Sequence, residues 1–159
     1  MSAYADTNFF TRWFLPLPDS DEARNWAESA QLQGDAPLPI TWLHRAEFVN
    51  ALQLHVYFGK QPGHVRVTTE QAASALESFR ADAAAGQFLN TVPVSIDVLD
   101  RLVEELSLRH TAKHGFRTYD LLHVASALLL GCDTFWSFDA RALELARLEG
   151  LKIPARKRR

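Results

Sequence analysis

Short apolar segments alternate with longer helical segments along this chain, and this alternation constrains the fold more than any other feature. Five segments are predicted to be strands, at residues 2–5, 39–43, 91–94, 134–138 and 151–154. Helices are predicted at about 8–15, 19–33, 44–58, 69–85, 95–113, 118–130 and 140–148. Strands separated by helices favour a parallel sheet that is covered on both faces. We therefore expect an α/β fold with a mostly parallel, twisted sheet flanked by helices on both faces.

The length and composition exclude several classes of protein. The 159 residues, 47% of them hydrophobic, suffice for one domain with a buried core, and 23% charged residues are not the composition of a disordered chain. The longest apolar run is Ala127–Leu130, far below the roughly 20 residues of a membrane span. The N-terminus lacks the features of a secretory signal, and the single Cys132 excludes an internal disulfide. We expect a cytoplasmic protein.

The overall charge gives little indication of a partner, but its distribution is uneven. With 17 basic and 19 acidic residues the formal net charge is −2, so bulk charge does not predict nucleic-acid binding. The chain nevertheless ends in four basic residues, 156–159, after a domain expected over residues 1–155. This basic tail is either a solvated end or an arm that touches phosphate or a partner.

Four carboxylates occupy positions that a parallel sheet brings toward one edge. Asp6 follows the first strand directly, and Asp139 follows the strand at 134–138. Asp120 lies in the first turn of the apolar helix that starts near residue 118, and Glu47 lies one turn into an earlier helix. Ligands of such sheets bind beyond the carboxyl ends of the strands. We therefore expect these acids to converge.

Each acid also has a purely structural explanation. Asp6, Asp120 and Asp139 precede or begin helices, where a carboxylate gains about 0.3–1 kcal/mol from the helix dipole and can cap free N–H groups. Glu47 fits this explanation less well, because it stands in a row of apolar residues where a charge needs a partner. Converging carboxylates would repel one another, and a divalent cation would relieve the repulsion. Oxygen ligands alone favour Mg²⁺ or Mn²⁺ over zinc.

The ordered set of motifs resembles the PIN-domain nuclease family and is most similar to its VapC-like ribonuclease toxins. The resemblance covers nearly the whole chain, and its motifs are Asp6-Thr7-Asn8 after the first strand, Glu47, the segment Asp120–Ala127 and Ser137-Phe138-Asp139. Ser137 stands where the family often has threonine, which keeps the hydroxyl. The family implies a parallel sheet flanked by helices, a Mg²⁺ or Mn²⁺ site and endonucleolytic hydrolysis of RNA.

The resemblance also implies roles for particular residues and partners. Asp6, Glu47, Asp120 and Asp139 would be catalytic and hold the metal and a water, while Asn8 and Ser137 would be accessory polar groups. The protein would be the toxin of a type II toxin–antitoxin pair, with RNA as substrate, a cognate antitoxin protein as partner, and a homodimer as the assembly. Independently of the family, Arg117 is one turn before Asp120 and either neutralises the acids, touches phosphate or is a surface arginine.

Other chemically capable residues have simpler interpretations. We expect His123 to be a packed, hydrogen-bonded histidine, and Cys132 to be a small buried residue. His110 and His114 are four apart on one helix, a possible metal pair, but a solvated face is the favoured interpretation. The four tryptophans are predicted to be mainly core residues.

The rival hypothesis is a binding module without catalysis. A receiver-like α/β domain also gathers acids at strand ends, but it needs a lysine after a late strand, and Lys152 is poorly placed for that role. An aspartyl phosphatase needs a second aspartate two residues after the first, where this chain has Asn8. A catalytically silent PIN-like RNA binder remains the main alternative.

Overall fold

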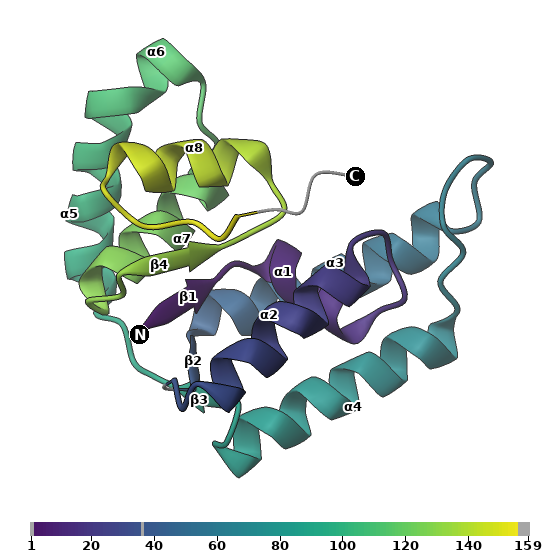
Figure 1. Cartoon of the computed structure of the whole chain (residues 1–159). Helices are drawn as coiled ribbons and strands as arrows, with labels where there is room; N and C mark the ends of the chain where they lie inside the picture. The colour runs from purple at the N-terminus through teal and green to yellow at the C-terminus, as the bar shows by residue number, and fades with distance from the viewer. Residues whose placement is uncertain (1, 36, 156–159) are drawn as a thin grey trace. The chain divides into compact units, whose positions relative to one another are not determined.

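The chain forms two compact units, each with its own short parallel sheet and its own helices. The computed structural model describes residues 2–35 and 37–155 (Figure 1). The described part of the first unit comprises residues 2–6 and 93–155, and the second unit is Thr7–Val92. The predicted basic tail, 156–159, lies outside the described residues. Within the described ranges, no helix is long and apolar enough to cross a membrane.

The first unit is built around two parallel strands. β1 (Ala3–Ala5) pairs with β4 (Thr134–Trp136), so that Ala3 lies opposite Thr134 and Ala5 lies opposite Trp136. Helices α5 (Ile96–Leu106), α7 (Thr118–Leu129) and α8 (Ala140–Leu148) complete this unit, and α7 packs against both α5 and α8. The π-helical segment Ser107–Thr111 and the short α6 (Ala112–His114) continue α5.

Helix α7 is the centre of this unit, and its composition explains why. Val124, Ala125 and Ala127 are completely buried, because the helix contacts neighbours on more than one side. Small residues at these positions let the neighbouring helices approach closely, so that little volume is left empty. The core around α7 also includes the fully buried rings of Tyr4 and Phe135, which stack at 5.8 Å.

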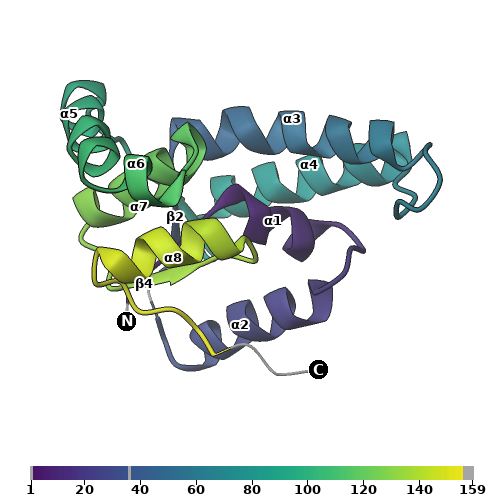
Figure 2. The same cartoon turned by 90° about the horizontal axis from the view of Figure 1, so that it is seen from above.

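The second unit is mainly helical. Its elements are α1 (Thr7–Phe14), α2 (Ser20–Leu32), β2 (Leu38–Ile40), α3 (Trp42–Phe58), α4 (Thr69–Ala85) and β3 (Leu89–Thr91). β2 and β3 are parallel, with Leu38 opposite Leu89. The long helices α3 and α4 lie side by side and form a hairpin (Figures 1 and 2).

Aromatic rings fill the core of the second unit. Phe48 of α3 and Phe79 of α4 are buried and lie 4.5 Å apart between ring centroids, and Phe10 of α1 contacts Phe79 edge-on. Edge-to-face and offset ring pairs at these distances add to the stabilisation from burial itself. The prediction that tryptophans are core residues is confirmed for Trp136, which is buried, but wrong for Trp42, whose side chain is 46% exposed.

The predicted α/β class and parallel pairing are confirmed, whereas four strand predictions need correction. The strand expected at 134–138 ends at Trp136, the last residue of β4. The strand expected at 91–94 is β3 at Leu89–Thr91, because Pro93 has no N–H to donate to a ladder. The strand expected at 39–43 ends at Ile40, because Thr41 caps α3. The strand expected at 151–154 is a single bridge between Lys152 and Thr134. The strands described here form two separate two-stranded sheets, one in each unit.

Gly59, at the end of α3, permits a close approach of two backbone segments. A Cβ atom at this position would lie 2.7 Å from the backbone nitrogen of Val67 and 2.9 Å from the carbonyl oxygen of His55. We predict that Gly59→Ala lowers the free energy of unfolding by about 2 kcal/mol, because the backbone would have to move apart. Gln61→Ala in the same loop should change it by less than about 0.5 kcal/mol. Equal chemical-denaturation midpoints for the two variants would contradict this packing.

Candidate active site

The carboxyl ends of β1 and β4 bring two of the predicted residues into contact. The ladder continues one step past the strands, since the N–H of Asp6 donates to the carbonyl of Trp136 at 3.0 Å. Ser137 follows β4 as Asp6 follows β1, and the Ser137 hydroxyl donates to Asp6 Oδ2 at 2.6 Å. Asp6 is 4% exposed and Ser137 is completely buried. The register of the two strands therefore places the Ser137 hydroxyl beside the Asp6 carboxylate.

The same serine connects this pair to a third predicted residue. Ser137 Oγ accepts a hydrogen bond of 2.8 Å from the backbone N–H of Asp139. Asp139 is the N-cap of α8, and its Oδ1 accepts from the N–H of Arg141 at 2.8 Å. The structural explanation of Asp139 as a helix cap is thus confirmed. The cap also fixes the orientation of its carboxylate beside Ser137.

Asp120 is close enough to Asp139 for their charges to interact. It is the third residue of α7, and its Oδ2 accepts from the backbone N–H of Arg117 at 3.0 Å. Burial raises the pKa of Asp120, and the negative charge of Asp139 raises it further. The hydrogen bond from the Arg117 N–H and the charges of Arg117 and Arg141 act in the opposite direction on this pKa. Hydrogen bonds link Asp6, Ser137 and Asp139, and a charge interaction links Asp139 to Asp120; we call these four residues of the first unit the acidic site.

Two arginines moderate the negative charge of this site. The prediction that Arg117 offsets the acids is consistent with its effect on the pKa of Asp120. Arg141 acts in the same way and was not predicted from the sequence. Its guanidinium donates to the carbonyl of Gly115 at 2.8 Å. Arg141 lies in the first turn of α8, where a positive charge is unfavourable because of the helix dipole. This unfavourable position is the one feature of the sequence that could have indicated a role for Arg141 in the site.

The remaining predicted site residues, Glu47 and Asn8, belong to the second unit. Glu47 is half-buried on α3, and Asn8 is half-buried on α1. Asn8 Oδ1 is buried and accepts no hydrogen bond from the described part of the chain. An unsatisfied buried acceptor costs about 1–3 kcal/mol, so this oxygen is suited to a ligand. The convergence of Glu47 and Asn8 with the acids of the first unit stays a prediction.

The donor chemistry of the acidic site fits Mg²⁺ or Mn²⁺. Asp6, Asp120 and Asp139 offer carboxylate oxygen atoms, which hard divalent cations prefer. Among residues 2–35 and 37–155, no group of three or more histidine, cysteine or acidic side chains is arranged as a metal-binding cluster. Mg²⁺ does not require such a cage, because it keeps several waters and commonly binds through one or two carboxylates together with substrate phosphates.

Two further predictions are confirmed. His123 is buried in α7 and its Nδ1 forms a hydrogen bond of 2.9 Å with the hydroxyl of Tyr4, as expected for a packed histidine. Cys132 is 7% exposed, and burial raises the pKa of its thiol. A buried thiol of raised pKa is a poor nucleophile, which agrees with its interpretation as a small core residue.

The expectation of a solvated face at His110 and His114 is wrong. His110 Nε2 lies 2.6 Å from a carboxylate oxygen of Glu149, and His114 Nδ1 lies 3.1 Å from one of Glu144. Both histidine side chains are largely covered, with 12% and 20% of their surfaces exposed. The glutamates belong to α8 and the residue after it, 30 and 39 positions along the chain, so local spacing could not reveal these pairs.

Comparison with known proteins identifies the family. The sequence profile of the PIN domain matches residues 3–148, a range that runs through both compact units. Among solved structures, the chain is similar to VapC20 of Mycobacterium tuberculosis, described as a sarcin–ricin loop cleaving toxin. The two share 14% sequence identity over 90% of this chain and 94% of VapC20, with a TM-score of 0.59, which shows a common fold. No functionally curated protein matches the sequence. The profile match spans most of the residues, and the chain belongs to the PIN-domain family.

Proposed function

We propose that this protein is a Mg²⁺- or Mn²⁺-dependent endoribonuclease, acting in the cytoplasm as the toxin of a type II toxin–antitoxin pair. The observation that carries the proposal is the Asp6–Ser137–Asp139 network beside Asp120. Family membership and the fold shared with VapC20 support the same conclusion. A homodimer, an RNA substrate and a cognate antitoxin protein are part of the proposal.

The residues of the site have distinct tasks in this proposal. Ser137 holds one oxygen of the Asp6 carboxylate, and the cap of α8 orients Asp139. Burial raises the pKa of Asp120, which suits its carboxylate to accept a proton from the attacking water. Arg117 and Arg141 supply positive charge for the phosphate. A bound divalent cation would polarise the phosphodiester and lower the pKa of the attacking water.

The first test is cleavage of total cellular RNA, and of a sarcin–ricin loop oligonucleotide, with Mg²⁺ or Mn²⁺. We predict cleavage that EDTA abolishes and products with 5′-phosphate and 3′-hydroxyl ends, as expected for attack by water. Ser137→Ala should reduce kcat by about 10- to 100-fold, because Asp6 loses the bond that positions it. Ser126→Ala is the matched control, since that buried hydroxyl donates only to the Leu122 carbonyl in the bonds described.

Four outcomes would contradict parts of this proposal. Undiminished cleavage in EDTA, or products with 2′,3′-cyclic ends, would exclude the metal mechanism. RNA binding without any cleavage would favour the catalytically silent alternative. Equal kcat for Ser137→Ala and Ser126→Ala would remove Ser137 from the site.

A second prediction concerns the stability of the metal-free protein. Because the folded-state pKa of Asp120 is raised, its contribution to stability is fully present below the unfolded-state pKa and is lost as the pH rises through the folded-state pKa. Asp120→Asn should therefore melt a few degrees above wild type at neutral pH in EDTA. The difference should shrink as the pH falls through the folded-state pKa and the wild-type carboxyl becomes protonated. Added Mn²⁺ should stabilise wild type more than the variant.

Asp139 provides a contrast within the same experiment. Asp139→Ala removes the cap of α8 and should lower the free energy of unfolding by about 1 kcal/mol, whereas Asp139→Asn keeps a capping oxygen. If Asp120→Asn melts below wild type at neutral pH, and Mn²⁺ shifts all variants equally, the acids are structural only.

The toxin role has its own test in cells. Expression of the wild-type chain in a bacterial host should arrest growth, because cleavage of RNA stops translation. Co-expression of the neighbouring antitoxin gene should relieve the arrest, and Ser126→Ala should arrest growth as wild type does. Normal growth, in cells that contain folded wild-type protein with RNase activity in their extracts, would contradict the toxin role but not the nuclease.

A further inference from the structure

The end of the α3–α4 hairpin has an unusual charge composition. We define the hairpin tip as residues 57–68, which comprise the last two residues of α3 and the loop that leads into α4. No aspartate or glutamate occurs between Glu47 and Glu70, although acids outnumber bases in the whole chain, 19 to 17. The hairpin tip carries Lys60 and Arg66, and neither forms a salt bridge within the described residues. The tip is therefore a local positive region.

Aromatic rings are exposed at the same place. Tyr57 is 59% exposed and Phe58 is 39% exposed, and their ring centroids are 5.3 Å apart. The His64 ring stacks on Phe58 at 5.5 Å, with 24° between the planes. Exposed ring faces on a positive surface suit unpaired nucleic-acid bases, which stack on aromatic side chains while basic groups contact the phosphates.

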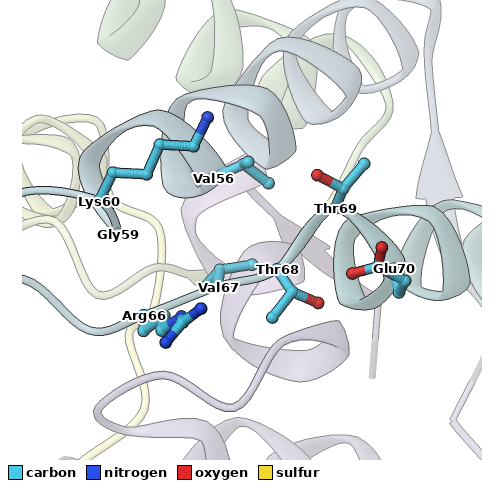
Figure 3. Close-up of a pocket in the computed structure, with 8 residues that line it drawn as sticks. All are labelled: Val56, Gly59, Lys60, Arg66, Val67, Thr68, Thr69 and Glu70. Atoms are coloured by element: carbon cyan, nitrogen blue, oxygen red, sulfur yellow. The ribbon is translucent and has the colours of Figure 1, made fainter.

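A pocket lined largely by residues of the hairpin tip has room for part of a nucleotide. Its volume is about 520 Å³, and it lies between the end of α3 and the start of α4 (Figure 3). Lys60 and Arg66 are on the loop side of this pocket, and Thr69 and Glu70 are on the α4 side (Figure 3). The close contact at Gly59 fixes the loop that forms one wall. Its volume is within the range of natural ligand pockets.

Glu70 is the one acid that lines this pocket, and its charge limits where a phosphate can sit. Its own backbone N–H and the Thr68 hydroxyl lower the pKa of Glu70, which keeps the carboxylate ionised. A phosphate would therefore bind on the side of Lys60 and Arg66, away from the start of α4. The hydroxyl of Thr68 is already used to cap α4, since it accepts from the N–H of Gln71 at 3.2 Å.

We propose that the hairpin tip is a binding surface for single-stranded RNA. Bases stack on the exposed rings of Tyr57 and His64, and backbone phosphates pair with Lys60 and Arg66. The choice of RNA as the nucleic acid rests on the proposed function. Phe58 lies eleven residues after Glu47 on the same helix, or about 16 Å at 1.5 Å per residue. One RNA strand can therefore contact both the tip and the region of Glu47.

The binding test uses the full chain in EDTA, so that cleavage does not interfere. Fluorescence anisotropy with an unstructured oligouridine should give about tenfold weaker binding for Tyr57→Ala, and Tyr57→Phe should restore the affinity. For Lys60→Ala/Arg66→Ala, the slope of log K against log salt concentration should decrease in magnitude by about 1.4, because two phosphate contacts are lost. The control pair Arg101→Ala/Lys113→Ala removes the same charge from exposed positions in the first unit and should leave the slope unchanged.

Cleavage measurements separate this inference from the proposed function. With Mg²⁺ or Mn²⁺, the tip variants should raise KM for long RNA and leave kcat unchanged. Tip-dependent binding by a wild-type protein that cleaves no RNA would support the binding surface and overturn the nuclease. Cleavage with the same KM in wild type and tip variants would support the nuclease and overturn the binding surface.

Two further outcomes would overturn the binding surface. Equal affinity of wild type and Tyr57→Ala for oligouridine would show that no base stacks on the tip. A change from dimer to monomer in sedimentation of Tyr57→Ala, with unchanged RNA affinity, would show instead that the exposed rings form a protein interface.

Discussion

The hydroxyl of Ser137 is the interaction on which the acidic site depends. It donates to the buried carboxylate of Asp6 and accepts from the N–H of Asp139, so it connects the ends of both strands to the start of α8. A buried carboxylate is tolerated only where hydrogen bonds replace its water. The pairing of β1 with β4 provides this hydrogen bond, because its register places Ser137, the residue after β4, beside Asp6, the residue after β1.

The structural roles of the acids do not exclude the catalytic roles that we propose for them. Asp120 and Asp139 stand in the first turn of α7 and at the cap of α8, where the helix dipoles favour negative charge. Each accepts a backbone N–H with one carboxylate oxygen, at 3.0 Å and 2.8 Å. The N-termini of α7 and α8 therefore offset part of the free-energy cost of burying Asp120 and of placing its charge near that of Asp139. This is why three acids can be held together in a protein of near-neutral net charge.

The sequence predicts the parts of the site that follow from local rules. Asp6 follows a strand and Asp120 lies in the first turn of an apolar helix, so their approximate places come from strand and helix signals alone. Ser137 is expected inside the strand at 134–138, but β4 ends at Trp136, one residue before it. The pairing of His110 with Glu149 and the contribution of Arg141 depend on packing between distant segments, which no spacing reveals. Short strands are also difficult, because a three-residue ladder is defined by its partner more than by its own composition.

An acidic site of this kind creates a problem for a polyanionic substrate, and the charge distribution of the chain addresses it. Three carboxylates repel RNA until a cation neutralises them, so the binding energy for RNA has to come from elsewhere on the protein. The net charge of −2 does not supply a general attraction. We propose that a local surface supplies this attraction, in the acid-free segment between Glu47 and Glu70 with its exposed rings and two cations. In this proposal, catalysis needs an acidic site and RNA binding needs a basic surface. Separate segments of the chain then provide the two.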